Sequence, residues 1–242
     1  MPNDGLRNQS RRAVLAAGAA FAVGAALRPA LAQAKMKIGV VGSGKIGGTV
    51  GRLWVKAGHP VLFSSRHPEE LAGMVKELGP LARAGTVTEA LAFGNAVLLA
   101  IPYGAYPAFG RDNAATLKGK VVLDAGNASP VRDGTEIAAE VEKDSIGIVS
   151  QKYLPGARLV RAFNTLNFRI LENEANRPAP RLAIPIAGDD AGALKVAAEL
   201  VSEAGFDPVV VGDLKDARRI QRGNPGYGQA VSAAVLKQKL GL

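Results

Sequence analysis

The feature that most constrains the fold of this chain is an apolar run, in residues 37–48, that leads directly into a glycine-rich turn. The turn fits the spacing G-x-G-x-x-G, with glycines at Gly42, Gly44 and Gly47. In a strand–turn–helix unit, the first glycine permits a tight turn and the second lets a pyrophosphate approach the backbone. The third lets the helix pack closely on the strand. The sequence therefore predicts a dinucleotide-binding α/β unit at this point.

A helix is expected from about Lys45, directly after the turn. Its first N–H groups have no partner within the helix, so they and the helix dipole attract an anion. A second apolar strand, at 60–64, follows at the distance expected of one βαβ unit. The residues predicted to lie against the phosphates are Gly42, Ser43, Gly44, Lys45, Ile46 and Gly47. The alternative is a glycine turn that binds no phosphate.

The residues after the second strand indicate which dinucleotide is bound. A site for NAD usually places Asp or Glu there, to bind the ribose 2′-hydroxyl. This chain instead has Ser64, Ser65 and Arg66, and its next carboxylates follow Pro68. Hydroxyls and a guanidinium suit a 2′-phosphate, which Arg can bind through two parallel hydrogen bonds. We therefore predict NADP as the cofactor; a solvated loop cation is the alternative for Arg66.

Strand and helix patterns alternate along the rest of the chain, as in a doubly wound, mostly parallel α/β sheet of the Rossmann type. Strands are predicted at 37–41, 60–64, 83–87, 95–100, 120–124, 158–162, 182–187 and 207–211. Helices are predicted at 45–57, 68–78, 88–93, from about 104, at 135–154 with an irregular centre, 189–204 and 227–239. We expect a single nucleotide-binding domain over 36–214 and a short helical C-terminal extension over 215–242.

Ligands of open parallel sheets bind beyond the carboxyl ends of the strands. Besides the glycine turn and Ser64–Arg66, three loops fall there, and they carry Ile101, Pro102 and Tyr103, then Asn127, then Phe163, Asn164 and Thr165. The first two of these residues suit packing on adenosine or ribose, and the two Asn side chains can hydrogen-bond to a ligand. Ordinary turn chemistry is the alternative for each Asn. A plain helix-start residue is the alternative for Tyr103.

The N-terminal residues 1–34 are typical of an export signal. Paired Arg11 and Arg12 precede an Ala-rich apolar run, and small residues of the A-x-A form follow near Ala32. This layout predicts a signal peptide of the twin-arginine (Tat) type, with transient binding to that export machinery and a periplasmic location. The alternatives are an uncleaved N-terminal anchor and a misassigned start, which would leave the protein in the cytoplasm.

Composition excludes several other classes of function. The formal net charge of +9 is compatible with anionic ligands, but no nucleic-acid motif or basic stripe with interleaved aromatics is visible, so no nucleic-acid binding is expected. The chain has no cysteine, which removes disulfides and thiolate sites, and only two histidines. No metal site is expected.

Over nearly all of residues 36–220, the chain resembles the F420-dependent NADP oxidoreductase family, also called NADPH-dependent F420 reductases. The same domain occurs in the cytosolic part of membrane metalloreductases. The matching segments are 37–47, 57–59, 64–66, 100–102, 122–127, 160–165, 186–190, 211–214 and 217–218. The resemblance implies hydride transfer between NADP(H) and a planar acceptor, either F420 or a flavin, stacked on the nicotinamide. It also places Phe163, Asn164 and Thr165 beside that ring.

Such chemistry depends on placing two rings together and needs no catalytic acid or base, so no catalytic residue is assigned. The segment 218–229 departs from the family, because it is rich in Gly and Arg where the family has a longer apolar helical region. Arg219, Arg222 and Tyr227 could shape a different acceptor site there, or form a solvated basic loop. Two other functions stay open: a non-catalytic NADP-binding module of an envelope complex, and a small imine or keto-acid reductase. The expected partner is a small-molecule electron acceptor, and a homodimer is left open.

Overall fold

Short runs of four to six residues, most of them apolar, form the strands of this protein, whose computed structural model describes residues 35–242. The predicted signal peptide, residues 1–34, lies outside the described residues. The strands are β1 (Ile38–Val41), β2 (Val61–Ser64), β3 (Ala82–Gly85), β4 (Ala96–Leu99), β5 (Val121–Asp124), β6 (Arg158–Arg161), β7 (Ala183–Gly188) and β8 (Asp207–Gly212).

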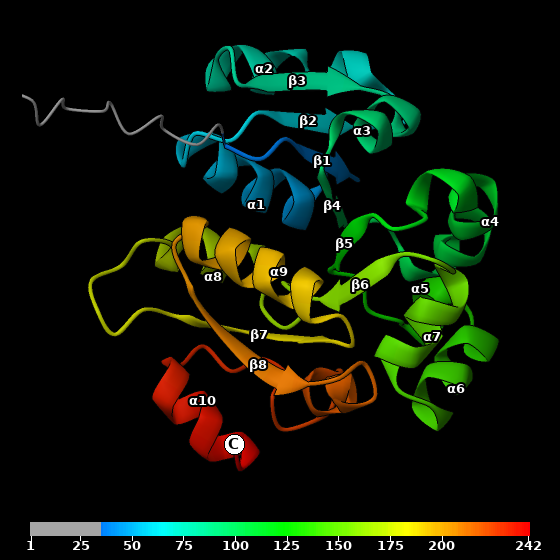
Figure 1. The fold of residues 1–242 in the computed structure, drawn as a ribbon, viewed down its shortest axis with the longest axis vertical. Helices are drawn as coiled ribbons and strands as arrows, with labels where there is room; N and C mark the ends of the chain where they lie inside the picture. Colours follow the sequence, from blue (N-terminus) through cyan, green and yellow to red (C-terminus); the bar gives the residue numbers. More distant parts are fainter. Residues whose placement is uncertain (1–34) are drawn as a thin grey trace, which may run out of the picture. The chain divides into compact units, whose positions relative to one another are not determined.

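These strands build one sheet in the order β3-β2-β1-β4-β5-β6-β7-β8, which runs from top to bottom in Figure 1. Strands β1 to β6 are parallel, β7 is antiparallel to β6, and β8 is parallel to β7. The first six strands therefore have the 3-2-1-4-5-6 order of the Rossmann fold, which confirms the predicted fold class. The strand order reverses between β1 and β4, and ligands of such sheets bind beyond the carboxyl ends of the strands at that point.

Strand residues alternate between two hydrophobic cores, one on each face of the sheet. In β1, Val40 belongs to the first core and Val41 to the second, and in β4 Leu98 and Leu99 divide in the same way. The first core is covered by α1 (Lys45–Lys56), α2 (Ala72–Leu78), α8 (Phe168–Glu174) and α9 (Ala191–Glu203). The second is covered by α3 (Val87–Phe93), α4 (Tyr106–Leu117), α6 (Thr135–Lys143), α7 (Ile146–Tyr153) and α10 (Ala233–Leu240). The result is a three-layer α/β/α arrangement.

Trp54 of α1 ties the glycine-turn helix to the rest of the first core. Its side chain is fully buried, and the indole N–H donates to the carbonyl of Leu200 in α9 at 2.8 Å. Its ring also meets the ring of Phe163 edge-on, with 5.8 Å between centroids. A buried indole needs such a hydrogen-bond partner. These contacts fix the helix that begins at the predicted phosphate site.

The predicted helix at 135–154 is two helices, α6 and α7, which separate at the expected irregular centre. The predicted helix at 227–239 is wrong at its start: α10 begins only at Ala233, because Gly228 has a φ of 73° and interrupts helical backbone. Residues Pro68–Leu71 form a 3-10 segment in place of the first turn of a helix. Helix α8 and the short α5 (Pro130–Asp133) were not predicted.

No helix within residues 35–242 is both long enough and apolar enough to cross a membrane.

Candidate functional site

The glycine turn joins β1 to α1 with the backbone that the sequence predicts. Gly42 has a φ of +94°, which L side chains rarely adopt. A Cβ on Gly47 would lie only 2.0 Å from the carbonyl oxygen of Gly42, so the helix packs against the turn as closely as a glycine allows. A Cβ on Gly44 would meet no protein atom within 4 Å. The space beside Gly44 is therefore open, where a pyrophosphate would approach.

Helix α1 begins at Lys45 without a side-chain cap on its first N–H groups. Helix N-termini of this kind bind phosphate, because the free N–H groups point outward and the helix dipole favours a negative charge. The open space at Gly44 and the uncapped helix end together fit a dinucleotide diphosphate. Lys45 and Ile46, also predicted to line the phosphate site, occupy the first turn of this helix.

Ser43 links the glycine turn to the end of β2. Its backbone N–H and its hydroxyl donate to the carbonyl oxygen of Ser64, at 3.1 and 3.0 Å. The Ser64 side chain is fully buried, and its hydroxyl has no hydrogen-bond partner among residues 35–242. The carbonyl of Ser64 therefore positions the glycine turn, and the contact of its hydroxyl with a ligand stays a prediction.

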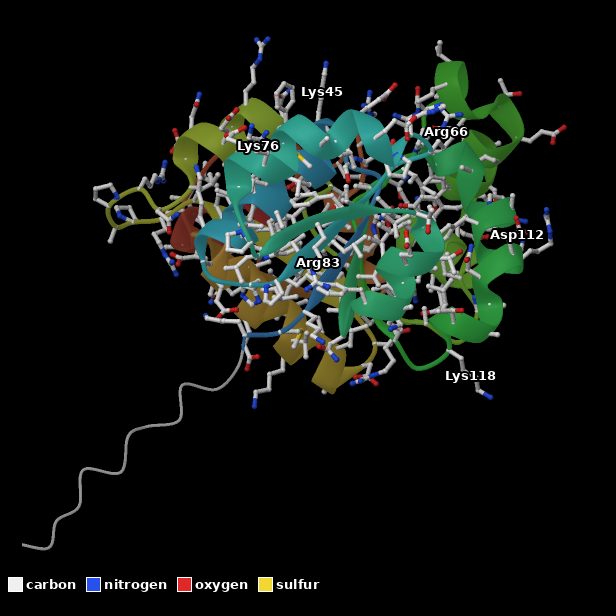
Figure 2. The ribbon with its side chains drawn as sticks, turned by 90° about the horizontal axis from the view of Figure 1, so that it is seen from above. Lys45, Arg66, Lys76, Arg83, Asp112 and Lys118 are labelled. Atoms are coloured by element: carbon white, nitrogen blue, oxygen red, sulfur yellow. The ribbon has the colours of Figure 1, made fainter. Side chains whose placement is uncertain are left out.

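The loop after β2 carries no carboxylate at the place where a ribose 2′-hydroxyl would bind. Ser65 accepts a hydrogen bond from the N–H of His67 at 3.1 Å. Arg66 is exposed and pairs with no carboxylate of residues 35–242. Figure 2 shows Lys45 and Arg66 along the same edge of the molecule. The guanidinium is free to bind an anion, as the NADP interpretation requires.

The loop after β4 brings two of its three predicted residues to the site. Ile101 is half-buried and Pro102 is exposed. The methyl Cγ2 of Ile101 lies 2.9 Å from where a Cβ on Gly42 would stand, so this residue flanks the glycine turn. Tyr103 is different, because its ring is fully buried and its hydroxyl lies 2.9 Å from that of Ser150. The predicted ligand contact of Tyr103 is corrected: its side chain supports the loop from within the second core.

A pocket of about 360 Å³ lies beyond the ends of β5 and β6, next to the first turn of α1. Its volume is within the range of ligand sites, about 300–1,000 Å³. Its lining residues carry no charged side chain: Ile46, Ala125, Asn127, Phe163, Asn164, Thr165, Leu166, Asn167, Ile170, Tyr227 and Gly228. The structure thus brings together Asn127 and the three residues that the family resemblance places beside the nicotinamide.

Two amide side chains hold this pocket together. Asn127 donates from Nδ2 to the carbonyl of Asn164 at 2.6 Å, and Asn164 donates from Nδ2 to the carbonyl of Ile220 at 3.1 Å. Their side-chain oxygens are buried and have no hydrogen-bond donor among residues 35–242. A buried acceptor without a donor is costly, so these oxygens are suited to a ligand with N–H groups, such as a carboxamide.

Phe163 lines the pocket mainly with its backbone. Its φ is +60°, an unusual value for a bulky residue, and its ring is 1% exposed. The ring packs against Trp54 and Phe206 in the first core. Backbone strain of this kind persists only where the surrounding packing enforces it, and it is common at functional sites. The ring anchors a turn that presents Asn164 and Thr165 to the pocket.

A buried ion pair beneath the pocket was not singled out by the sequence. Asp124 is the last residue of β5 and Arg161 the last of β6, and the two are neighbours in the sheet register. Their side chains form a salt bridge, and both are fully buried. Asp124 also accepts from the N–H of Gly126 at 2.9 Å, while Arg161 donates to the carbonyl of Gly126 at 2.5 Å. The backbone N–H and the carbonyl of Gly126 are therefore both held by this pair. The sequence signal that could have indicated this pair is a charged residue at the end of each of two neighbouring strands.

Two tyrosines complete this buried network. The hydroxyl of Tyr106 donates to Asp124 at 2.6 Å, and the Tyr103 and Tyr106 rings lie 4.5 Å apart. Burial, and then the negative charge of Asp124, raise the pKa of both tyrosines well above the usual value. Burial, the largest single effect, lowers the pKa of Arg161, but Asp124 and the two tyrosines together raise it above the usual value. The tyrosines stay neutral and the guanidinium stays charged at physiological pH.

Within residues 35–242, no group of three or more His, Cys, Asp or Glu side chains is placed to hold a metal ion.

The model of one protein family matches residues 37–128, a stretch from β1 to the loop after β5 that includes the glycine turn and Asn127. That family is described as NADP oxidoreductase, coenzyme F420-dependent. Residues 37–128 of this chain are thus similar to the F420-dependent NADP oxidoreductase family. Its members are NADP oxidoreductases, so the match agrees with the 2′-phosphate interpretation of the loop after β2.

Solved structures extend the family likeness to most of the chain. A hypothetical protein from Sinorhizobium meliloti is 25% identical, with a TM-score of 0.70, over 82% of this chain and 95% of that one. A candidate F420-dependent NADP reductase from Arthrobacter sp. is 27% identical, with a TM-score of 0.63, over 76% of this chain and 87% of that one. An imine reductase from Myxococcus stipitatus, 15% identical with a TM-score of 0.56, shares the fold.

A curated relative, the metalloreductase STEAP3 of Rattus norvegicus, is 26% identical over 188 residues. The match covers 76% of this chain but 36% of the relative, so this chain spans about a third of that protein.

Proposed function

We propose that this protein is an NADP(H)-dependent oxidoreductase that transfers hydride between the nicotinamide and a planar acceptor of the flavin or deazaflavin type. In the reducing direction, NADPH, the acceptor and one proton give NADP⁺ and the two-electron-reduced acceptor. The observation that carries the proposal is the uncharged pocket of 360 Å³ beside the glycine turn. The match of residues 37–128 to an NADP oxidoreductase family supports it.

Hydride transfer between two rings requires them to be held close together and aligned. The pocket suits this task, because apolar side chains such as Ile46 and Ile170 line it together with neutral amides. Since no charged side chain of the described lining is positioned as an acid or base, the additional proton would come from solvent.

Each part of the chain has a distinct role in holding the dinucleotide. Gly44 and the start of α1 would bind the pyrophosphate, and Arg66 the 2′-phosphate. The buried oxygens of Asn127 and Asn164 would accept hydrogen bonds from the carboxamide. Bound NADPH supplies the hydride, and these residues fix which face of its ring is open to the acceptor.

We further propose that the protein works in the periplasm after export through the twin-arginine route, on the strength of Arg11, Arg12 and the apolar run that follows. That route carries folded proteins, so a dinucleotide bound in the cytoplasm would travel with the protein. Tight NADP binding, with reduction in place, would then allow turnover outside the cytoplasm.

The decisive experiment compares NADPH with NADH. In calorimetric titrations, Arg66→Ala is expected to weaken NADPH binding roughly 10- to 100-fold, since a hydrogen-bonded charge pair of about 1.5–3 kcal/mol is lost. NADH lacks the 2′-phosphate, so its affinity should change less than about twofold. Consumption of NADPH is then followed at 340 nm with flavin, F420, ferric and imine acceptors.

Arg111→Ala is a matched control, because Arg111 is an exposed arginine on α4, away from the glycine turn. It should leave both affinities unchanged. Equal losses for NADPH and NADH in Arg66→Ala would contradict the 2′-phosphate role. Tight NADPH binding without oxidation by any of these acceptors would favour a non-catalytic module.

A further inference from the structure

The C-terminal segment 220–228 forms one wall of the neutral pocket and is attached to the opposite wall at both ends. At its start, the carbonyl of Ile220 accepts a hydrogen bond from Asn164 at 3.1 Å. At its end, the N–H of Gly228 donates to the carbonyl of Thr165 at 3.0 Å. The segment is therefore joined to Asn164 and Thr165, two of the three residues expected beside the nicotinamide.

The backbone within this segment is also fixed. Gln221 is buried and accepts from the N–H of Ile146 at 3.1 Å, and the N–H of Gly226 donates to the carbonyl of Arg219 at 2.9 Å. A Cβ on Gly226 would lie 2.8 Å from that same carbonyl oxygen. The backbone therefore turns tightly at Gly226, where a larger residue would not fit. The wall is a built part of the site.

Within segment 220–228, Tyr227 is the aromatic residue that lines the pocket. It is half-buried, and the guanidinium of Arg222 lies 5.7 Å from its ring centroid. The other aromatic residue of the described lining, Phe163, has its ring committed to Trp54 and Phe206 in the core. Among the described lining residues, Tyr227 thus offers the aromatic surface for a ligand.

We propose that Tyr227 is the specificity-determining residue for the electron acceptor: its ring stacks on a flat, uncharged ring system, and Arg222 supports it. This inference rests on the proposed function, because it places the acceptor next to an NADP site. Offset stacking of two rings contributes beyond simple burial, and a cation near the second face of the tyrosine holds it in place. The segment that supplies both residues lies outside residues 37–128, the stretch that matches the family model.

The test uses riboflavin as the probe, added to the mature protein saturated with NADP⁺, with binding followed by quenching of flavin fluorescence. Tyr227→Leu is expected to weaken riboflavin binding roughly tenfold, because the stacking surface is lost. Tyr227→Phe keeps the ring and should bind within about twofold of the unchanged protein. Arg222→Gln should weaken binding by a smaller factor. NADPH affinity, measured separately by calorimetry, should fall by a smaller factor than riboflavin affinity in Tyr227→Leu.

Each contrary outcome identifies which claim has failed. Absence of NADPH binding by the unchanged protein would refute the proposed function itself. NADPH binding without riboflavin binding, or equal riboflavin affinity in Tyr227→Leu, would overturn the role of Tyr227 and leave the NADP site standing. If Tyr227→Phe lost NADPH oxidation as completely as Tyr227→Leu, the hydroxyl would be the functional group, and stacking would be refuted. Circular dichroism of each variant checks folding.

Discussion

At the scale of single residues, the three glycines of the first turn meet three different physical demands. Gly42 is required by its positive φ, and Gly47 by the carbonyl oxygen that a Cβ would strike at 2.0 Å. Gly44 has neither constraint, because its φ is −74° and the space around it is open. Folding alone does not explain a glycine there, whereas the approach of a ligand to the backbone does.

Replacing Gly44 with alanine should therefore separate binding from folding. The added methyl group would occupy the space of the pyrophosphate, and overpacking typically costs about 1–3 kcal/mol. NADPH affinity in a calorimetric titration should fall roughly 10- to 100-fold. The melting temperature should change little, since the methyl group meets no protein atom.

Gly73→Ala is the matched control, because Gly73 in α2 also has open space at its Cβ position and no positive φ. It should bind NADPH normally. Unchanged NADPH affinity in Gly44→Ala would contradict the phosphate site, and a large loss of stability would show that Gly44 has a structural role.

The residue scale also shows where sequence reasoning reaches its limit. Motif spacing predicted the glycine turn and the absence of a carboxylate after β2, because both depend on local chain geometry. Tyr103 was predicted at the cleft since it follows a strand, yet its ring turns into the core to reach Ser150. The direction of a side chain beyond a strand depends on residues far along the chain, and spacing alone does not reveal it.

At the scale of elements, the ends of β5 and β6 form one rigid unit. Asp124 and Arg161 are fully buried and pair across the two strands. Asp124 accepts from the N–H of Gly126, and Arg161 donates to its carbonyl. A Cβ on Gly126 would lie 2.2 Å from the hydroxyl of Tyr106, so the loop fits closely over the network. Burying two charges is costly, so a pair of this kind is better explained by the positioning of the loops than by stability.

Breaking the pair from one side should be severe. Asp124→Asn leaves the Arg161 guanidinium buried without a counter-charge, which typically costs about 3–5 kcal/mol. The double variant Asp124→Asn with Arg161→Met removes the uncompensated charge and should recover part of this loss. Urea unfolding monitored by Trp54 fluorescence measures both free energies. A single variant within about 1 kcal/mol of the unchanged protein would show that the pair is unimportant for folding.

Sequence patterns predicted the elements of the first six strands well, because continuous apolar runs bounded by Gly and Pro are characteristic of buried parallel strands. They failed for α8, a seven-residue helix whose start is fixed by the Asn167 side chain accepting from the N–H of Arg169 at 2.9 Å. They also extended α10 too far back. In both places, local polar contacts and tertiary packing decided the structure, and no hydrophobic period could indicate it.

At the scale of the whole molecule, the candidate site draws on both ends of the described chain. The glycine turn lies near its start, and Tyr227 and Gly228 come from its last quarter. Parallel strands β1 to β6 place their following loops at one edge of the sheet. The segment after β8 is joined to that edge by the hydrogen bonds from Asn164 to the carbonyl of Ile220 and from the N–H of Gly228 to the carbonyl of Thr165. A dinucleotide would therefore be bound only by the folded protein.

Because the twin-arginine route carries folded proteins, the export proposal can be tested by changing the arginine pair while leaving the folded domain intact. Replacing both Arg11 and Arg12 with lysine keeps the charge but removes the arginine pair that the twin-arginine machinery reads. Cell fractionation should then find the variant in the cytoplasm, whereas the unchanged protein and the control Arg7→Lys should reach the periplasm. Both forms should bind NADPH equally in extracts, because the site lies within residues 35–242. Periplasmic protein in equal amounts from the paired variant would refute this route, and loss of NADPH binding in it would show that the N-terminal segment contributes to the site.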